Sequence, residues 1–180
     1  AIFSVIEGVL IKPLPYPDPD RLIAVWHTSP GLSIPQLPNA PSTWFTYREE
    51  SRTFEDIGLW RNDTNSVTGL AEPEEVPSLQ VTDGLLGILG VQPAAGRLFN
   101  SRDMAPGAPE TVVLSNGYWK RRFAGDLSAI GQKLNIDSRP REIIGVLPPD
   151  FRFQSRKFSF VLPFQFDRAK TKLGNFSYQA

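Results

Sequence analysis

Cysteine is absent from this 180-residue chain, and histidine occurs only once, at His27. Without cysteine the chain can form neither a disulfide nor a thiolate metal site, and a single imidazole cannot supply the ligands of a typical zinc centre. The lack of cysteine permits an oxidising compartment without demonstrating one. The 19 basic and 19 acidic residues balance, so no net field draws the chain to nucleic acid or an anionic membrane. We therefore expect neither a metal site nor a nucleic-acid partner.

Patterns that accompany catalysis or nucleotide binding are also missing. A threonine and a serine follow His27, but the chain contains no G-x-S-x-G nucleophile elbow. Gly84, Gly87 and Gly90 are spaced by three residues, which fits neither the dinucleotide-binding pattern nor the P-loop. We expect a protein that is not an enzyme, with no catalytic, cofactor-binding or metal-binding residues and no cofactor.

Local clusters of charge are interpreted as solvated surface. The acidic residues near two proline-containing turns lack the alternating ligands and central glycine of a calcium loop; they are Asp18, Asp20, Glu72, Glu74 and Glu75. The basic run at residues 120–122 would point to different sides of a helix, which indicates a solvated face rather than a nucleic-acid patch. Asn62 and Asn175 match the N-glycosylation pattern, which we interpret as chance.

Residues 1–11 are almost wholly apolar, but a membrane-spanning helix needs about 20 apolar residues. A secretory signal peptide would place basic residues before such a run and a small-residue cleavage site after it, and neither is present. Two interpretations stay open, namely the outer end of a transmembrane helix or a short amphipathic helix of the folded domain. The proline-rich residues 13–19 then predict a stiff, extended spacer.

The first half of the chain predicts short elements separated by turns. In order, they are a buried strand at 21–26, a loop at 27–41, a helix from Ser42 to about Ser51, a second short helix beginning with a capping box at 53–56, strands at 65–68 and 76–81, and a helix capped by Thr82 that ends at Gly90.

Residues 111–153 give the clearest pattern in the chain. A short apolar strand at 111–114 is followed by Ser115, a favourable helix N-cap. Trp119 and Phe123 are four residues apart and so share one helix face, which we expect to be buried while Lys120 and Arg121 stay in water. Gly125 can end the helix in the left-handed conformation. Two strands at 132–137 and 141–146 then form a hairpin, and a further strand is expected at 158–164.

The sequence VVLSNGYWKRRFAGDLSAIGQKLNIDSRPREIIGVLPPDFRF strongly resembles that of the MacB-like periplasmic core domain of FtsX-type ABC-transporter permeases. The sequences of residues 1–20, 51–57, 81–99 and 161–164 also match motifs of this family, and they occur in the same order. The resemblance is to the branch of large, duplicated permeases common in soil bacteria, which often lack an ATPase on the same chain. It favours the transmembrane interpretation of residues 1–11.

The resemblance implies an α+β fold with two lobes, mixed sheets and short helices. Residues 1–20 would be the end of a transmembrane helix and its exit spacer, and residues 21–96 the first half of a membrane-proximal lobe of βαβ type. Residues 97–166 would form an inserted mixed α/β lobe, and residues 167–180 would begin the return to the first lobe. The fold would be truncated at its C-terminus, and the missing half would leave a sheet edge exposed.

The function implied is that of a non-catalytic domain on the periplasmic side of the inner membrane, which couples transmembrane motion to substrate export or partner engagement. The implied partners are the remaining transmembrane part of the permease and a separate ABC ATPase subunit. A periplasmic adaptor and a second copy of the chain, covering the exposed edge, are further candidates. The alternative function is a stand-alone extracytoplasmic module that binds or senses a ligand or a protein.

Overall fold

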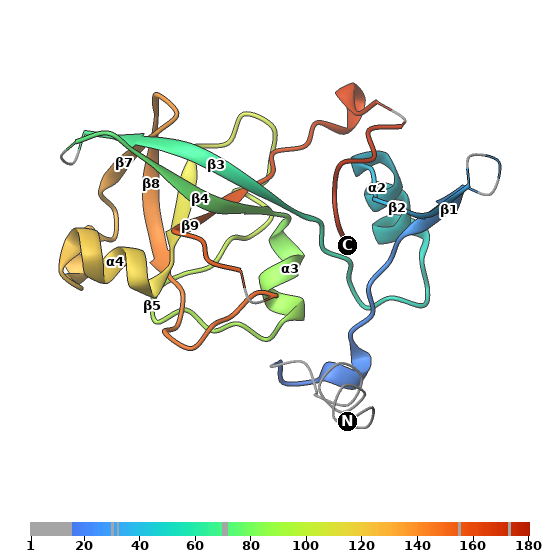
Figure 1. Cartoon of the computed structure of the whole chain (residues 1–180), viewed down its shortest axis with the longest axis horizontal. Helices are drawn as coiled ribbons and strands as arrows, with labels where there is room; N and C mark the ends of the chain where they lie inside the picture. Colours follow the sequence, from blue (N-terminus) through green and yellow to red (C-terminus); the bar gives the residue numbers. More distant parts are fainter. Residues whose placement is uncertain (1–15, 30, 32, 70–71, 155, 173) are drawn as a thin grey trace.

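The computed structural model describes residues 16–29, 31, 33–69, 72–154, 156–172 and 174–180. Figure 1 shows two regions side by side: a barrel of residues 60–163, and a smaller region of residues 22–59 and 164–180, which we call the α2 region. The architecture is α+β with short helices, as expected. The predicted end of a transmembrane helix at residues 1–11 lies outside the described residues. Among the helices that are described, none is both long and apolar enough to cross a bilayer.

The barrel is a sheet closed on itself. Its strands lie in the order β5-β8-β6-β9-β4-β3-β7, and β7 also pairs with β8, so the six strands from β8 to β7 form a closed ring to which β5 is added at β8. Strands β4 and β9 are parallel, as are β6 and β8, and the other pairs are antiparallel. Closure pairs backbone groups that an open sheet would leave at its edges. The strands are β3 (Trp60–Thr68), β4 (Glu74–Val81), β5 (Ala95–Gly96), β6 (Thr111–Leu114), β7 (Lys133–Ile136), β8 (Arg139–Val146) and β9 (Phe160–Pro163).

Strands from both sides of the expected lobe boundary near residue 96 share this one sheet. Strand β4 pairs with β9, and β3 pairs with β7. The division into residues 21–96 and 97–166 therefore does not coincide with a break in the sheet. Pairing between strands far apart in sequence leaves no local signal, so composition could not indicate it.

The central strands are buried on both faces. In β6, Val112 and Leu114 belong to one apolar cluster, whereas Val113 belongs to a second. In β9, Phe160 and Val161 are divided between the same two clusters. Helix α4 (Asn116–Phe123) packs on the first cluster and helix α3 (Asp83–Ile88) on the second. Strands covered on both faces have continuous apolar sequences, which explains why both strands could be predicted.

Helix α4 begins as predicted, but a different aromatic residue fills the core. The hydroxyl oxygen of Ser115 accepts a hydrogen bond from the backbone N–H of Tyr118 at 3.2 Å. Tyr118 is the buried residue, with 1% of its surface exposed, while Trp119 and Phe123 are only partly buried. The prediction that Trp119 and Phe123 form the buried face is therefore wrong in part, because both rings pack on the core but Tyr118 is the residue that is fully buried.

Tyr118 can be buried because its polar end is satisfied. Its hydroxyl donates to Oε1 of Glu74 at 2.9 Å. Lys120 and Arg121 are exposed, as expected. The left-handed conformation begins one residue before Gly125, at Ala124 with φ 52°.

The predicted hairpin is confirmed with a shifted turn. Strands β7 and β8 are antiparallel, and Asp137 and Ser138 form the turn with φ of 51° and 62°. Two successive positive φ values match the twist of a two-residue hairpin. Arg139 and Pro140, expected in the connection, already belong to β8.

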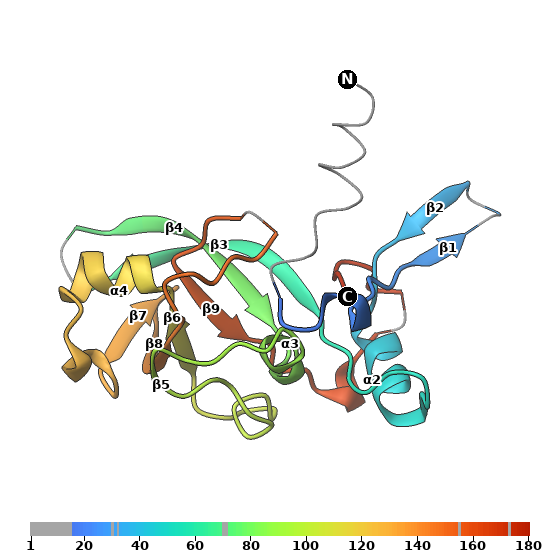
Figure 2. The same ribbon diagram turned by 90° about the horizontal axis from the view of Figure 1, so that it is seen from below.

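The sequence before residue 60 was predicted less well. Residues 22–26 are irregular rather than a buried strand, and Ile23 and Trp26 are 65% and 49% exposed. The predicted loop at 27–41 instead contains a hairpin of β1 (His27–Ser29) and β2 (Ile34–Leu37). Figure 2 shows this hairpin projecting away from the barrel.

Helix α2 (Pro41–Glu50) begins one residue before the predicted Ser42. Pro41 occupies the first helical position, where its missing N–H costs nothing, so Ala40 becomes the N-cap. The hydroxyl of Thr43 accepts from the N–H of Ala40 at 3.2 Å. The second helix predicted from the capping box at residues 53–56 is not formed, because Ser51 Oγ accepts from the N–H groups of the next turn instead.

Helix α3 confirms the predicted short helix. Thr82 is at its N-cap position, but the hydroxyl accepts from the N–H of Leu59 at 2.9 Å rather than from the helix. Gly90 follows with φ of +66°, as a helix-ending glycine would.

Candidate functional site

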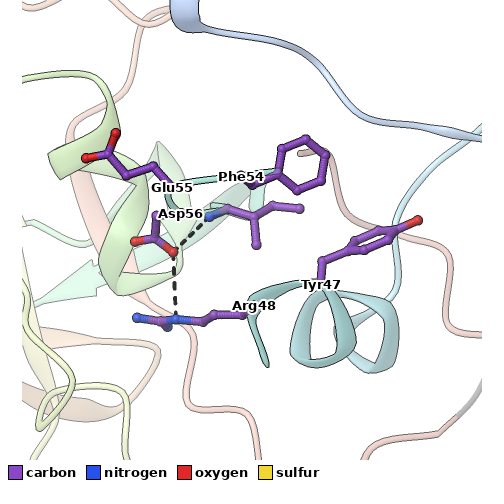
Figure 3. Close-up of a pocket in the computed structure, with 6 residues that line it drawn as sticks. Tyr47, Arg48, Phe54, Glu55 and Asp56 are labelled. Carbon is purple, nitrogen blue, oxygen red and sulfur yellow. Dashed lines mark hydrogen bonds and ion pairs between the residues drawn. The ribbon is translucent and has the colours of Figure 1, made fainter. Parts of the chain in front are cut away.

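Two surface hollows involve the α2 region: the first lies within it, and the second is lined by residues of both the α2 region and the barrel. The first has a volume of about 270 Å³ and is shown in Figure 3. It lies against α2 and the segment that follows it, and is lined by Tyr47, Arg48, Phe54, Glu55, Asp56 and Ile57.

Arg48 is the central group of the first hollow. Its Nη1 and Nη2 donate to the two carboxylate oxygens of Asp83 at 2.7 and 3.2 Å, and its Nε lies 3.7 Å from Oδ1 of Asp56. The guanidinium carbon also lies 5.2 Å from the centre of the Trp44 ring. Hydrogen bonds to Asp83 raise the pKa of Arg48 above its usual value.

This arrangement joins two helices rather than preparing a reaction. Arg48 comes from α2 and Asp83 from the first turn of α3, so a two-pronged ion pair connects the α2 region to the barrel. The same carboxylate oxygen of Asp56 that faces Arg48 accepts from the N–H of Ile57 at 2.8 Å (Figure 3). The carboxylate of Asp56 is thus held in place by the backbone, and the site acts as a structural joint.

The second hollow is larger, about 450 Å³, and lies where β3 meets the C-terminal residues. Its lining is polar apart from one tryptophan and consists of Trp60, Arg61, Asn62, Gln154, Arg156, Ser177 and Gln179. Asn62, considered above as a chance glycosylation match, is thus part of a surface concavity.

His27 is packed among aromatic rings. Its ring stacks on Tyr47 with centres 6.0 Å apart and planes inclined by 11°, and the edge of Phe176 approaches it at 6.0 Å. Within the described residues, no hydrogen bond connects the imidazole to a carboxylate or a hydroxyl group. Its role in this structure is therefore to pack the hairpin against α2.

The acidic residues considered as cation ligands do not converge. Glu74 binds the hydroxyl of Tyr118 and pairs with Arg122 at 2.6 Å, while Asp18, Asp20 and Glu72 are exposed elsewhere. In the described part of the chain no three His, Asp or Glu side chains are grouped so that they could hold a metal ion. Burial, followed by the bond to Glu74, raises the pKa of Tyr118 to about 12.

The model of one protein family, the MacB-like periplasmic core domain, matches residues 1–178. The chain belongs to this family. MacB-like periplasmic core domains are extracytoplasmic parts of ABC-transporter permeases, and the resemblance seen in the sequence is therefore confirmed. A comparison with curated proteins finds no match.

Solved structures of similar fold come from the same kind of transporter. The periplasmic region of MacB from Actinobacillus actinomycetemcomitans is 17% identical, with a TM-score of 0.60 over 85% of this chain and 67% of that one. The extracellular domain of YknZ, a noncanonic ABC-type transporter from Gram-positive bacteria, is 18% identical, with a TM-score of 0.56 over 79% of this chain and 76% of that one. At such low identity these likenesses establish the fold of this MacB-like domain.

Sequence reasoning missed both hollows. The partners Arg48 and Asp83 are 35 residues apart, and Trp60 lies 119 residues from Gln179, with which it pairs. The aromatic residues before Arg48 and the helix start at Thr82 indicated the elements, but nothing local indicated that those elements meet.

Proposed function

We propose that this chain is a non-catalytic extracytoplasmic domain of an ABC-transporter permease, which couples movement of transmembrane helices to substrate export or to engagement of a partner. The observation that supports this proposal is the match of the family model over residues 1–178. The fold agrees with it, because the similar structures are periplasmic or extracellular domains of transporters.

In this proposal residues 1–20 connect the domain to the membrane, and residues 167–180 begin the return to the first lobe. The proposed first half of the membrane-proximal lobe, residues 21–96, and the proposed inserted lobe, residues 97–166, are continuous through the barrel, because β4 pairs with β9 and β3 with β7. The domain lies on the periplasmic side of the inner membrane. Its partners are the transmembrane part of the permease and a separate ABC ATPase subunit. A periplasmic adaptor and a second copy of the chain are further partners to test.

The joint between Arg48 and Asp83 gives the coupling a physical route. A displacement that reaches the domain through residues 16–26 acts on both regions, because the N–H of Val25 donates to the carbonyl oxygen of Ala180 at 3.1 Å and the hydroxyl of Tyr16 donates to the carbonyl oxygen of Arg152, within the barrel, at 3.2 Å. The bidentate pair then transfers it from α2 to α3. Helix α3 packs directly on the barrel core, so the barrel moves with α2 rather than independently of it.

Cysteine labelling of the permease in its membrane tests the location of the domain. The chain has no cysteine, so a single introduced thiol gives the only signal from this domain. We expect Lys120→Cys, at an exposed position, to react with a membrane-impermeant maleimide in whole cells. Leu134→Cys, which is fully buried, is the matched control and should react only after denaturation. Labelling of Lys120→Cys solely in lysed cells would contradict the proposed location.

The same approach tests coupling. Glu55 lines the first hollow beside the α2–α3 joint, so the labelling rate of Glu55→Cys should change when ATP is added to inside-out vesicles loaded with the maleimide. The rate of Lys120→Cys, distant in the barrel, should change less. Equal rates with and without ATP at both positions would show that nucleotide does not move this domain.

A further inference from the structure

The floor of the second hollow is a short pair of strands. Trp60 and Gln179 are antiparallel partners that exchange two backbone hydrogen bonds, both 2.9 Å long. Side chains directly opposite each other in such a pair lie on one face, as do residues two positions further along each strand. Asn62 and Ser177 therefore extend the same face, and all four side chains line the hollow.

One wall of the hollow carries a cation beside an aromatic ring. The guanidinium carbon of Arg156, an exposed residue, lies 5.4 Å from the centre of the Trp60 ring. The edge of Phe153 packs against that ring, 4.9 Å away and inclined by 84°. The backbone N–H of Arg156 donates to the carbonyl oxygen of Phe153 at 2.8 Å. The contact with Trp60 uses none of the guanidinium N–H groups, which can therefore bind a ligand.

The two arginines of the hollow differ in availability. Arg61 donates to Oε1 of Gln80 at 2.6 Å and lies over the rings of Phe164 and Tyr178. For Arg156, the described residues provide no carboxylate partner and no side-chain hydrogen bond. The same holds for the side-chain amides of Asn62, Gln154 and Gln179 within that part of the chain. Arg156 is thus the cation that a ligand would meet.

We propose that this hollow binds an extended, acidic peptide segment of a partner protein. A guanidinium binds a carboxylate through two parallel hydrogen bonds, and among the described residues that line the hollow none carries a carboxylate to compete with such a ligand. Each side-chain amide offers both donors and an acceptor, which matches the amides of a peptide backbone. Trp60 and Asn62 on one strand and Ser177 and Gln179 on the other line the hollow at every second residue, a spacing that suits an extended chain rather than a compact ligand. The proposal does not depend on transport, because it concerns binding to the chain itself.

Nuclear magnetic resonance of the 180-residue chain can test this site with two matched probes. One is acetyl-Gly-Glu-Gly-Glu-Gly-amide, and the other has glutamine in place of both glutamates. The acidic peptide should shift the side-chain amide signals of Asn62 and Gln179 saturably, with a dissociation constant on the order of 1 mM or below. The neutral peptide should bind at least about tenfold more weakly, since it cannot form the charged pair with Arg156.

Arg156→Gln should weaken binding of the acidic peptide by about tenfold or more. Lys157→Gln is the matched control, because it removes the same charge from the next residue, which is exposed and does not line the hollow; it should change binding by less than about twofold. If both variants lost the same amount of affinity for the acidic peptide, the attraction would be due to general charge, and the proposal would be overturned. Shifts that map elsewhere, or no saturable shift, would also overturn it, and acetate binding as tightly as the peptide would reject the peptide as the ligand.

Discussion

In the barrel, the central strands are buried on both faces and the sheet closes through β7. The α2 region, by contrast, has a two-stranded sheet and a single longer helix. Isolated backbone bridges connect the C-terminal residues to Asn39 and Trp60. Of the four large apolar side chains that are exposed in the described residues, three lie in this region: Ile23, Trp26 and Phe176. The two regions are thus stabilised by different means.

The barrel strands form their backbone hydrogen bonds with one another. The α2 region, in contrast, builds its core from segments that are distant in sequence. Its core joins Trp44, Ile57 and Leu59 to Phe164 and Tyr178. Two-stranded sheets are marginal in water without packing from another element. We therefore expect the α2 region to open at a lower free energy than the barrel, which suits a part that receives motion.

The largest expected effect is in the barrel. Tyr118→Ala should lower the free energy of unfolding by about 3–5 kcal/mol, because it removes a fully buried ring and leaves a cavity under α4. Trp119→Ala should cost less, since that ring is only partly buried. Lys120→Ala, at an exposed position of the same helix, should cost less than about 0.5 kcal/mol. Denaturant melts measure all three, and equal losses for Tyr118→Ala and Lys120→Ala would mean that α4 does not pack as described.

The next effect separates the two regions. Trp44 is buried and its indole N–H donates to the carbonyl oxygen of Ile57 at 2.8 Å. Trp44→Ala should destabilise the α2 region by about 3 kcal/mol. Hydrogen exchange should then accelerate in residues 41–50, while β6 and β8 keep their protection. Acceleration of the same size in both strands would show that the regions unfold as one unit.

The same contrast explains what the sequence could predict. Residues 111–146 were predicted well because an apolar strand, a capping serine and a hairpin are close neighbours and their signals are local. Residues 21–59 were predicted poorly because their partners lie elsewhere: Asn39 pairs with Tyr178, and the N–H of Val25 donates to the carbonyl oxygen of Ala180. Both hollows could not be predicted for the same reason, because the residues that meet there are far apart in the sequence.

A smaller effect tests the joint between the regions. Arg48 is about one-third exposed and Asp83 about one-tenth (side-chain exposures of 36% and 10%), so solvent screens the pair in part. The coupling energy from a double-mutant cycle of Arg48→Ala and Asp83→Ala should be about 1 kcal/mol. Arg52→Ala, an exposed arginine just after α2, is the control and should show no coupling to Asp83→Ala. If the coupling is zero in the first cycle as well, the ion pair does not join the two regions in solution.

The smallest effect compares how the two longer helices end. Helix α4 ends at Ala124, which has φ 52° and ψ 19°, a left-handed conformation that disfavours any residue with a Cβ. Helix α2 ends at Ser51, whose φ of −69° is ordinary for every residue. Ala124→Gly should therefore stabilise the protein by about 0.5–1 kcal/mol, because relief of strain exceeds the added freedom of the unfolded chain. Ser51→Gly should destabilise it by a similar amount, since Ser51 Oγ accepts hydrogen bonds from the N–H groups of Thr53 and Phe54. Thermal melts of the two variants should thus shift in opposite directions. A shift of the same sign would mean that one of the two helix ends is assigned incorrectly.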